Sequence, residues 1–83
     1  MTYYKAFNKD LTCIEHKFEI GKTYKVEGKL EMCKNGFHCC QNILNCLRYY
    51  RADSRFCEVS IGDEHITDDD KTVSKQITID REN

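Results

Sequence analysis

Apolar and polar residues alternate along several short segments of the chain, which is the period of a β-strand with one buried face. The alternation is clearest over residues 72–79, where Val73, Ile77 and Ile79 fall on one face and polar residues on the other. Glycine, asparagine and aspartate separate the segments, and proline is absent. We therefore predict a small antiparallel meander. Its strands are expected over residues 2–7, 11–14, 17–20, 23–26, 30–33, 55–61 and 72–79.

One segment follows a helical period instead. Its apolar residues recur at the spacing i, i+3, i+4 and i+7, which places them on one face of a helix: Ile43, Cys46, Leu47 and Tyr50. Asn42 precedes them as a suitable N-cap, because its side-chain oxygen can accept an unpaired backbone N–H. A helix of about eight residues is marginal alone, so it must pack on the sheet. The predicted fold class is α+β: a small, mostly antiparallel sheet with one short helix packed on a face.

Length and composition fit one folded domain over residues 1–83. The chain is 40% hydrophobic and 33% charged, which supplies a thin core and an ordinary charged surface. The first residues contain no apolar signal segment, and no stretch is long enough to span a membrane. We therefore expect a cytoplasmic protein without a membrane partner. Its six cysteines are then expected to be reduced and mostly buried as small apolar residues.

Charge is distributed unevenly along the chain, although the net charge is only −1. Residues 1–60 hold ten Lys or Arg against seven Asp or Glu, whereas residues 61–83 hold three against seven. The near-neutral sum argues against general nucleic-acid binding, which needs surplus cations. The acidic segment is either a solvated hairpin loop or a negative patch for a basic partner surface. Its acids are Asp63, Glu64, Asp68, Asp69 and Asp70.

A basic and aromatic cluster follows the helix. Positive side chains near a helix C-terminus are favoured by the helix dipole, which explains the cluster without any function. The alternative is a contact surface for a partner or a nucleotide. The residues of this surface are Arg48, Tyr49, Tyr50 and Arg51.

Cysteine and histidine are concentrated before the helix. Cys33, His38 and Cys40 could supply zinc ligands, with a fourth from elsewhere in the fold, although no C-x-x-C pair is present. Cys40 near the helix start, with His38 two residues away, could also form a nucleophilic pair. Burial as core filler is the third interpretation. The sequence holds no complete catalytic set, so we expect neither an enzyme nor a cofactor.

Several blocks occur in an order that resembles a family of small uncharacterised domains carried by bacteriophages and prophages. The resemblance extends over most of the chain and implies a setting in an infected bacterium rather than a mechanism. The blocks are Lys5-Ala6-Phe7-Asn8-Lys9-Asp10-Leu11-Thr12-Cys13, Phe18-Glu19-Ile20-Gly21-Lys22-Thr23-Tyr24, Cys33-x-x-Gly36-Phe37-His38-x-Cys40, Tyr49-Tyr50 and Ser54-Arg55-Phe56-Cys57-Glu58-Val59.

A fainter resemblance is to the central part of ADP-ribosyltransferases. There a glycine-led strand, a helix ending in an aromatic residue and a strand reading Glu-Val follow one another, and Gly36-Phe37-His38, Tyr49-Tyr50 and Phe56-Cys57-Glu58-Val59 are similar in order. The chain lacks a Ser-Thr-Ser block and a late catalytic glutamate. The resemblance implies a reduced relative with a nucleotide-sized groove near His38, Tyr49 and Arg55.

Together these features lead to a functional hypothesis. We expect a small phage-encoded binding protein that inhibits a host defence system stoichiometrically, in the manner of an anti-CRISPR protein. Its partner would be a host protein, such as a nucleic-acid-processing defence enzyme in the bacterial cytoplasm. The contact would use the acidic segment 63–70 or the surface 48–51. The alternatives are a nucleotide-binding remnant and a zinc-stabilised small domain.

Overall fold

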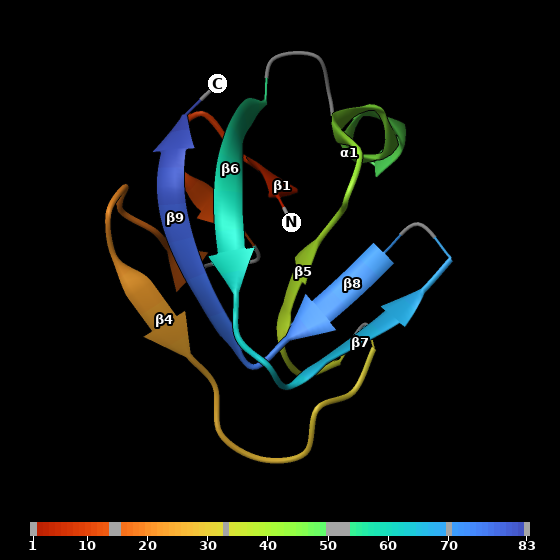
Figure 1. The fold of residues 1–83 in the computed structure, drawn as a ribbon. Helices are drawn as coiled ribbons and strands as arrows, with labels where there is room; N and C mark the ends of the chain where they lie inside the picture. The colour runs from red at the N-terminus through yellow and green to blue at the C-terminus, as the bar shows by residue number, and fades with distance from the viewer. Residues whose placement is uncertain (1, 14–15, 33, 50–53, 70, 83) are drawn as a thin grey trace.

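The computed structural model describes residues 2–13, 16–32, 34–49, 54–69 and 71–82, and for residues 47–49 it describes the backbone alone. One short helix accompanies the strands of this part of the chain (Figure 1). In chain order the elements are β1 (Tyr3–Phe7), β2 (Thr12–Cys13), β3 (His16–Lys17), β4 (Thr23–Lys25), β5 (Phe37–Cys39), α1 (Ile43–Tyr49), β6 (Arg55–Ile61), β7 (His65–Asp68), β8 (Lys71–Ser74) and β9 (Gln76–Glu82).

The strands form two main sheets, and every strand pair among them is antiparallel. One sheet has the order β1-β6-β9-β4 and the other β5-β8-β7, while β2 and β3 form a separate hairpin. An isolated bridge joins the two sheets: the backbone N–H of Tyr4 donates to the Cys40 carbonyl at 2.7 Å, and that of Cys40 to the Tyr4 carbonyl at 2.8 Å. The architecture is thus predominantly β, and the predicted mostly antiparallel sheet with one short helix is confirmed in outline.

A long bent hairpin runs through both sheets. Its first arm is β6 followed by β7, and its second arm is β8 followed by β9 (Figure 1). At the bend the backbone N–H of Lys75 donates to the Glu64 carbonyl at 3.2 Å, and that of Val26 donates to the Lys75 carbonyl at 2.9 Å. Because Lys75 is held from both sides, the chain changes sheets there while its backbone groups stay paired.

Two apolar clusters fill the interior. The larger one is formed by strands of both main sheets and the β2–β3 region, and the smaller one lies between β1 and α1. Strand β1 serves both, because its successive side chains point to opposite faces. The buried members of the larger cluster are Tyr3, Phe7, Leu11, Phe18, Phe37, Cys39, Cys57, Val59, Ile77 and Ile79, and those of the smaller are Ala6, Cys40 and Cys46.

Helix α1 begins as the sequence predicts. The side-chain oxygen of Asn42 accepts the backbone N–H of Leu44 at 2.9 Å, which is the bond of an N-cap. Cys46 is buried against Ala6 of β1, and its thiol donates to the Tyr4 carbonyl at 3.5 Å. The helix therefore packs on β1, which supplies the tertiary contact that so short a helix requires.

Three of the strand predictions are wrong in part. Residues 30–32 form no strand; instead Glu31 pairs with Asn35 in a tight turn whose backbone bonds are 2.9 and 3.0 Å. Strand β3 ends at Lys17, so Phe18 lies outside it. Phe18 is nevertheless buried, because it packs against the Phe7 ring rather than pairing in a strand. The segment 72–79 is two strands in different sheets, divided at Lys75.

The acidic segment is also not simply a loop. Residues 65–68 form β7, and the hydroxyls of Thr67 and Thr72 lie 2.9 Å apart across the hairpin. Cross-strand threonine pairs of this kind stabilise antiparallel strands. Strand β8 is buried on both faces, since Thr72, Val73 and Ser74 are all buried.

Within the described parts of the chain, no helix has the length and apolar character needed to cross a membrane.

Candidate functional site

The acidic residues of the C-terminal part flank an edge strand. β7 is the outer strand of the sheet β5-β8-β7, and all four of its residues are exposed. Ile66, at the middle of β7, is one of the large hydrophobic side chains left exposed, at 43%. An edge strand offers a row of backbone N–H and C=O groups to another extended segment. We call β7, together with Asp63, Glu64, Asp68 and Asp69, the acidic edge.

The carboxylates of the acidic edge differ in how far they are neutralised. Glu64 forms an ion pair with Lys75, with 3.3 Å between Oε2 and Nζ. Asp63, Asp68 and Asp69 are exposed, and none of the three pairs with a cation among the described residues. The edge therefore keeps a net negative charge. Of the predicted acids, Asp70 lies outside the described residues.

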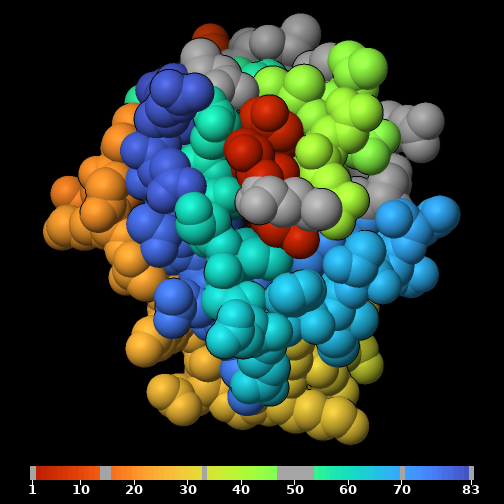
Figure 2. All heavy atoms as spheres, viewed as in Figure 1, coloured from red at the N-terminus to blue at the C-terminus, as the bar shows by residue number. Residues whose placement is uncertain are grey.

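The tip of the hairpin holds this edge in place. Asp68 stands opposite Lys71, so the connecting loop has two residues. Asp69 adopts a φ of 59°, the left-handed conformation that two-residue hairpin loops require and that aspartate tolerates better than most side chains. Figure 2 shows the β7–β8 hairpin, in light blue, at the lower right of the face in view. The loop chemistry thus positions the acids at the outside of the fold.

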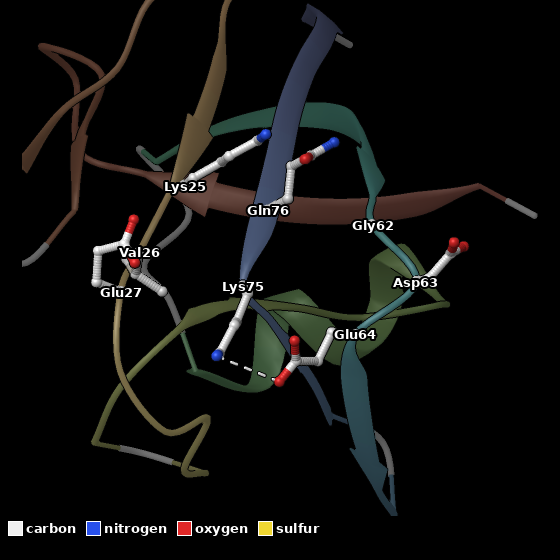
Figure 3. A pocket seen from close by; sticks show the side chains of 8 residues that line it. All are labelled: Lys25, Val26, Glu27, Gly62, Asp63, Glu64, Lys75 and Gln76. Atoms are coloured by element: carbon white, nitrogen blue, oxygen red, sulfur yellow. Dashed lines mark ion pairs between the residues drawn. The ribbon is translucent and has the colours of Figure 1, made fainter.

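A hollow of about 230 Å³ lies at the base of the hairpin, at the bend between the sheets (Figure 3). Figure 3 shows Lys75 and Glu64 directed toward each other, whereas Asp63 points away from Lys75. Lys25 and Glu27 also contribute to the lining. Since both charges are present and the central pair is satisfied, this Lys75 hollow shows no preference for a ligand of one charge.

A second hollow, of about 240 Å³, lies on another side of the molecule and has a different lining. It contains the cations Lys5 and Lys34, the imidazoles of His16 and His38, and the rings of Phe18 and Phe37 among others. None of the described lining residues is Asp or Glu. We call it the Lys5 pocket. Of these residues, only His38 is predicted from the sequence as a site residue.

Lys5 is the unusual member of this pocket, because it is only 4% exposed. It lies on β1 between Tyr3 and Phe7, on the face of the strand that contributes to the larger cluster. Its ammonium donates to the His38 carbonyl at 2.7 Å and lies 5.8 Å from the centre of the Phe7 ring. The sequence shows a lysine between two aromatic residues at strand spacing, but only the structure shows that this face of β1 is buried in the larger cluster.

The residues predicted to surround a nucleotide are not all brought together. His38 lines the Lys5 pocket, and burial, followed by the charges of Lys5 and Lys71, lowers the pKa of its imidazole. Arg55 is not among the described lining residues; its guanidinium binds Glu82 through two bonds of 2.8 and 2.6 Å. The hydrogen bond from Arg55 lowers the pKa of the Glu82 carboxyl. The side chain of Tyr49 lies outside the described residues.

The predicted basic and aromatic surface lies outside the described part of the chain as well. Arg48 and Tyr49 belong to α1, but their side chains are not described, and neither are Tyr50 and Arg51. This surface stays a prediction.

Three of the buried thiols have raised pKa values and are protonated at neutral pH. Burial raises the pKa of Cys39 to about 12 and that of Cys57 to about 11. A hydrogen bond with Cys40, and then burial, raise the pKa of Cys46. Because the thiolate is the reactive form, these three cysteines are poor nucleophiles in the folded protein. None of the five described cysteines forms a disulfide, and all but Cys13 are buried: Cys13, Cys39, Cys40, Cys46 and Cys57.

The zinc hypothesis depends on Cys33, which lies outside the described residues. His38 and Cys40 are described, but the described residues contain no group of three or more His, Cys, Asp or Glu side chains placed to hold a metal ion. Zinc binding by Cys33, His38 and Cys40 stays a prediction.

Comparison with known proteins gives a family. No curated protein and no solved structure matches the chain. A family model matches it over residues 1–83, which is its full length. The chain therefore belongs to the family described as domain of unknown function DUF7666.

Proposed function

We propose that the chain is a binding protein that presents its acidic edge to a basic surface of a protein partner. The observation that carries this proposal is an edge strand exposed along its whole length, with three carboxylates beside it that have no cation among the described residues. Edge strands are usually protected against pairing, and exposed Ile66 makes this one less protected. Charge complementarity then selects a basic partner and speeds its association.

The kind of partner follows from its charge. A basic surface that could bind the carboxylates of the acidic edge is typical of nucleic-acid-processing enzymes, since their grooves carry surplus Lys and Arg. We propose that the partner is such an enzyme in the defence system of a bacterial host, and that the chain occupies its groove as a stoichiometric inhibitor. The resemblance to phage and prophage domains supports this setting.

The test is a comparison of variants in affinity purification from host lysate. The edge variant carries Asp63→Asn, Asp68→Asn and Asp69→Asn, since asparagine also tolerates the left-handed conformation at position 69. The control variant removes three exposed carboxylates elsewhere, by Glu19→Gln, Glu31→Gln and Asp80→Asn. We expect a stoichiometric partner with the wild type and the control, and at least about tenfold weaker binding with the edge variant.

Two outcomes would contradict the proposal. Equal binding by the edge variant and the wild type would remove the acidic edge as the contact surface. Loss of binding with Arg48→Ala and Arg51→Ala alone would move the contact to the helix end instead. Salt dependence gives a further check, because binding between exposed charges weakens as ionic strength rises.

A further inference from the structure

The geometry points to the Lys5 pocket as a binding site for a small anion that carries a planar ring. This site is separate from the acidic edge and does not depend on the function proposed for that edge. The inference rests on a buried cation, on the charges around it and on the rings beside it.

The first step concerns the charge of Lys5. Lysine is almost never buried to this degree unless it is paired, because removal of an ammonium from water costs several kcal/mol. In the described ion pairs, each carboxylate binds another cation: Glu58 binds Arg81, Glu82 binds Arg55, Glu64 binds Lys75 and Glu19 binds Lys22. The residue opposite Lys5 on β6 is Cys57, which offers no carboxylate, and Glu58 of that strand stands opposite Tyr4 instead.

The second step concerns the hydrogen bonds of the ammonium. An ammonium has three N–H donors, and Lys5 uses one of them on the His38 carbonyl. Within the described residues no further acceptor binds it. Lys5 lines an open hollow of about 240 Å³. An anion bound in that hollow would accept hydrogen bonds from the two remaining N–H donors and would also balance the positive charge.

The third step concerns the rest of the lining. Lys34 is exposed at the rim and adds a second positive charge. The ring of His16 lies 4.4 Å from that of Phe18 and 6.2 Å from that of Phe37, measured between ring centres. His16 is exposed, so one part of this aromatic group faces the solvent side of the pocket. A planar ring can pack there by stacked or edge-to-face contact.

The size of the pocket limits the ligand. Pockets for drug-sized molecules usually enclose about 300–1,000 Å³, so this one admits a single small ring with its anionic group. A nucleoside monophosphate, with part of the molecule outside the pocket, and an aromatic carboxylate share this chemistry. Gly36 forms part of the wall, and a Cβ there would lie 2.5 Å from the Val73 side chain.

The experiment is a calorimetric titration of the full chain with five probes. AMP and benzoate carry both a ring and an anionic group, whereas adenosine and benzamide carry only the ring and inorganic phosphate carries only the charge. We expect AMP or benzoate to bind at least about tenfold more tightly than the probe that lacks its charge and than phosphate. If AMP and benzoate both fail to bind, or if phosphate binds as tightly as either, the inference is wrong.

Variants locate the binding site. Lys5→Met removes the ammonium and keeps most of the side-chain volume, and we expect it to weaken binding at least about tenfold. Lys25→Met, on the exposed edge strand β4, is the matched control and should bind as the wild type does. Should Lys5→Met fail to fold, exposed Lys34→Ala gives a second measurement, with an expected loss of about twofold to fivefold. Unchanged binding in Lys34→Ala and in any folded Lys5→Met would overturn the assignment.

Discussion

The acidic edge and the Lys5 pocket differ in both the sign of their charge and its exposure. The carboxylates of the edge are solvated, so their presence on a folded protein needs no special explanation. The ammonium of Lys5 is buried and faces no carboxylate among the described residues, so its charge is expensive to keep. An exposed like-charged surface suits a large partner of opposite charge, whereas a single buried charge suits a small ligand that can enter the fold.

The change with the largest expected effect is Gly36→Ala. It tests whether the acidic edge and the Lys5 pocket both depend on tight packing against β8. Gly36 has a φ of 129°, and an added Cβ would lie 2.5 Å from Val73 and 2.6 Å from Leu30 side-chain atoms. Val73 belongs to β8, which joins the pocket strand β5 to the edge strand β7. We expect a loss of about 2–4 kcal/mol in the free energy of unfolding, from backbone strain together with overpacking.

Gly21→Ala is the control for that experiment. Gly21 also has a left-handed φ, of 92°, but an added Cβ there would meet nothing within 4 Å. We expect a loss of about 1 kcal/mol from backbone strain alone. Urea unfolding measures the free energy of unfolding of both variants. Equal losses in Gly36→Ala and Gly21→Ala would show that Gly36 is not tightly packed against β8.

A smaller effect is expected from removing each hollow's central lysine. Lys5→Met replaces a buried charge by an apolar side chain of similar volume, so stability should stay equal or rise by about 1 kcal/mol. Lys75→Met breaks a partly exposed ion pair, so stability should fall by no more than about 0.5 kcal/mol. Chemical unfolding would measure both, and a loss above about 1 kcal/mol for Lys5→Met would mean that its charge is already compensated.

The smallest effect concerns pH. Because the folded state lowers the pKa of His38 below its ordinary value of 6.5, folding favours the neutral imidazole. The contribution of the neutral His38 imidazole to the free energy of unfolding is complete above about pH 6.5. It is lost as the pH falls toward the lower pKa that His38 has in the folded state. Lys5→Met removes one of the causes, so it should raise the pKa of His38. An NMR titration of the imidazole measures this pKa. An unchanged pKa in Lys5→Met would show that the charge of Lys5 does not act on His38.

Much of the fold could be predicted from local sequence patterns. The helix start at Asn42 and the strand over residues 55–61 follow from a capping residue and from alternation, and both are observed. The division of segment 72–79 at Lys75 could not be predicted, since it depends on two backbone bonds to other segments: the Lys75 N–H donates to the Glu64 carbonyl, and the Val26 N–H donates to the Lys75 carbonyl. Alternation finds a strand but not the sheet that each half of it joins.

The candidate sites show a similar limit. The acids of the edge were visible as a cluster in the sequence, and what the structure adds is that β7 runs between them. The Lys5 pocket joins residues from β1, β3, β5 and the turn after residue 30, so only the fold brings them together. The sequence did hold one clue, because strand period places Lys5 on the same face as the aromatic residues Tyr3 and Phe7. That this face is buried is known only from the structure.

The central claim is that the molecule carries two separate binding regions of opposite charge. An NMR map of backbone amide shifts tests it most directly, with AMP as one probe and an arginine-rich peptide as the other. We predict that AMP shifts amides around Lys5 and His38, and that the peptide shifts those of β7 and its flanking acids. If both probes shift the same amides, or if neither AMP nor benzoate in its place shifts amides of the Lys5 pocket, the account is contradicted.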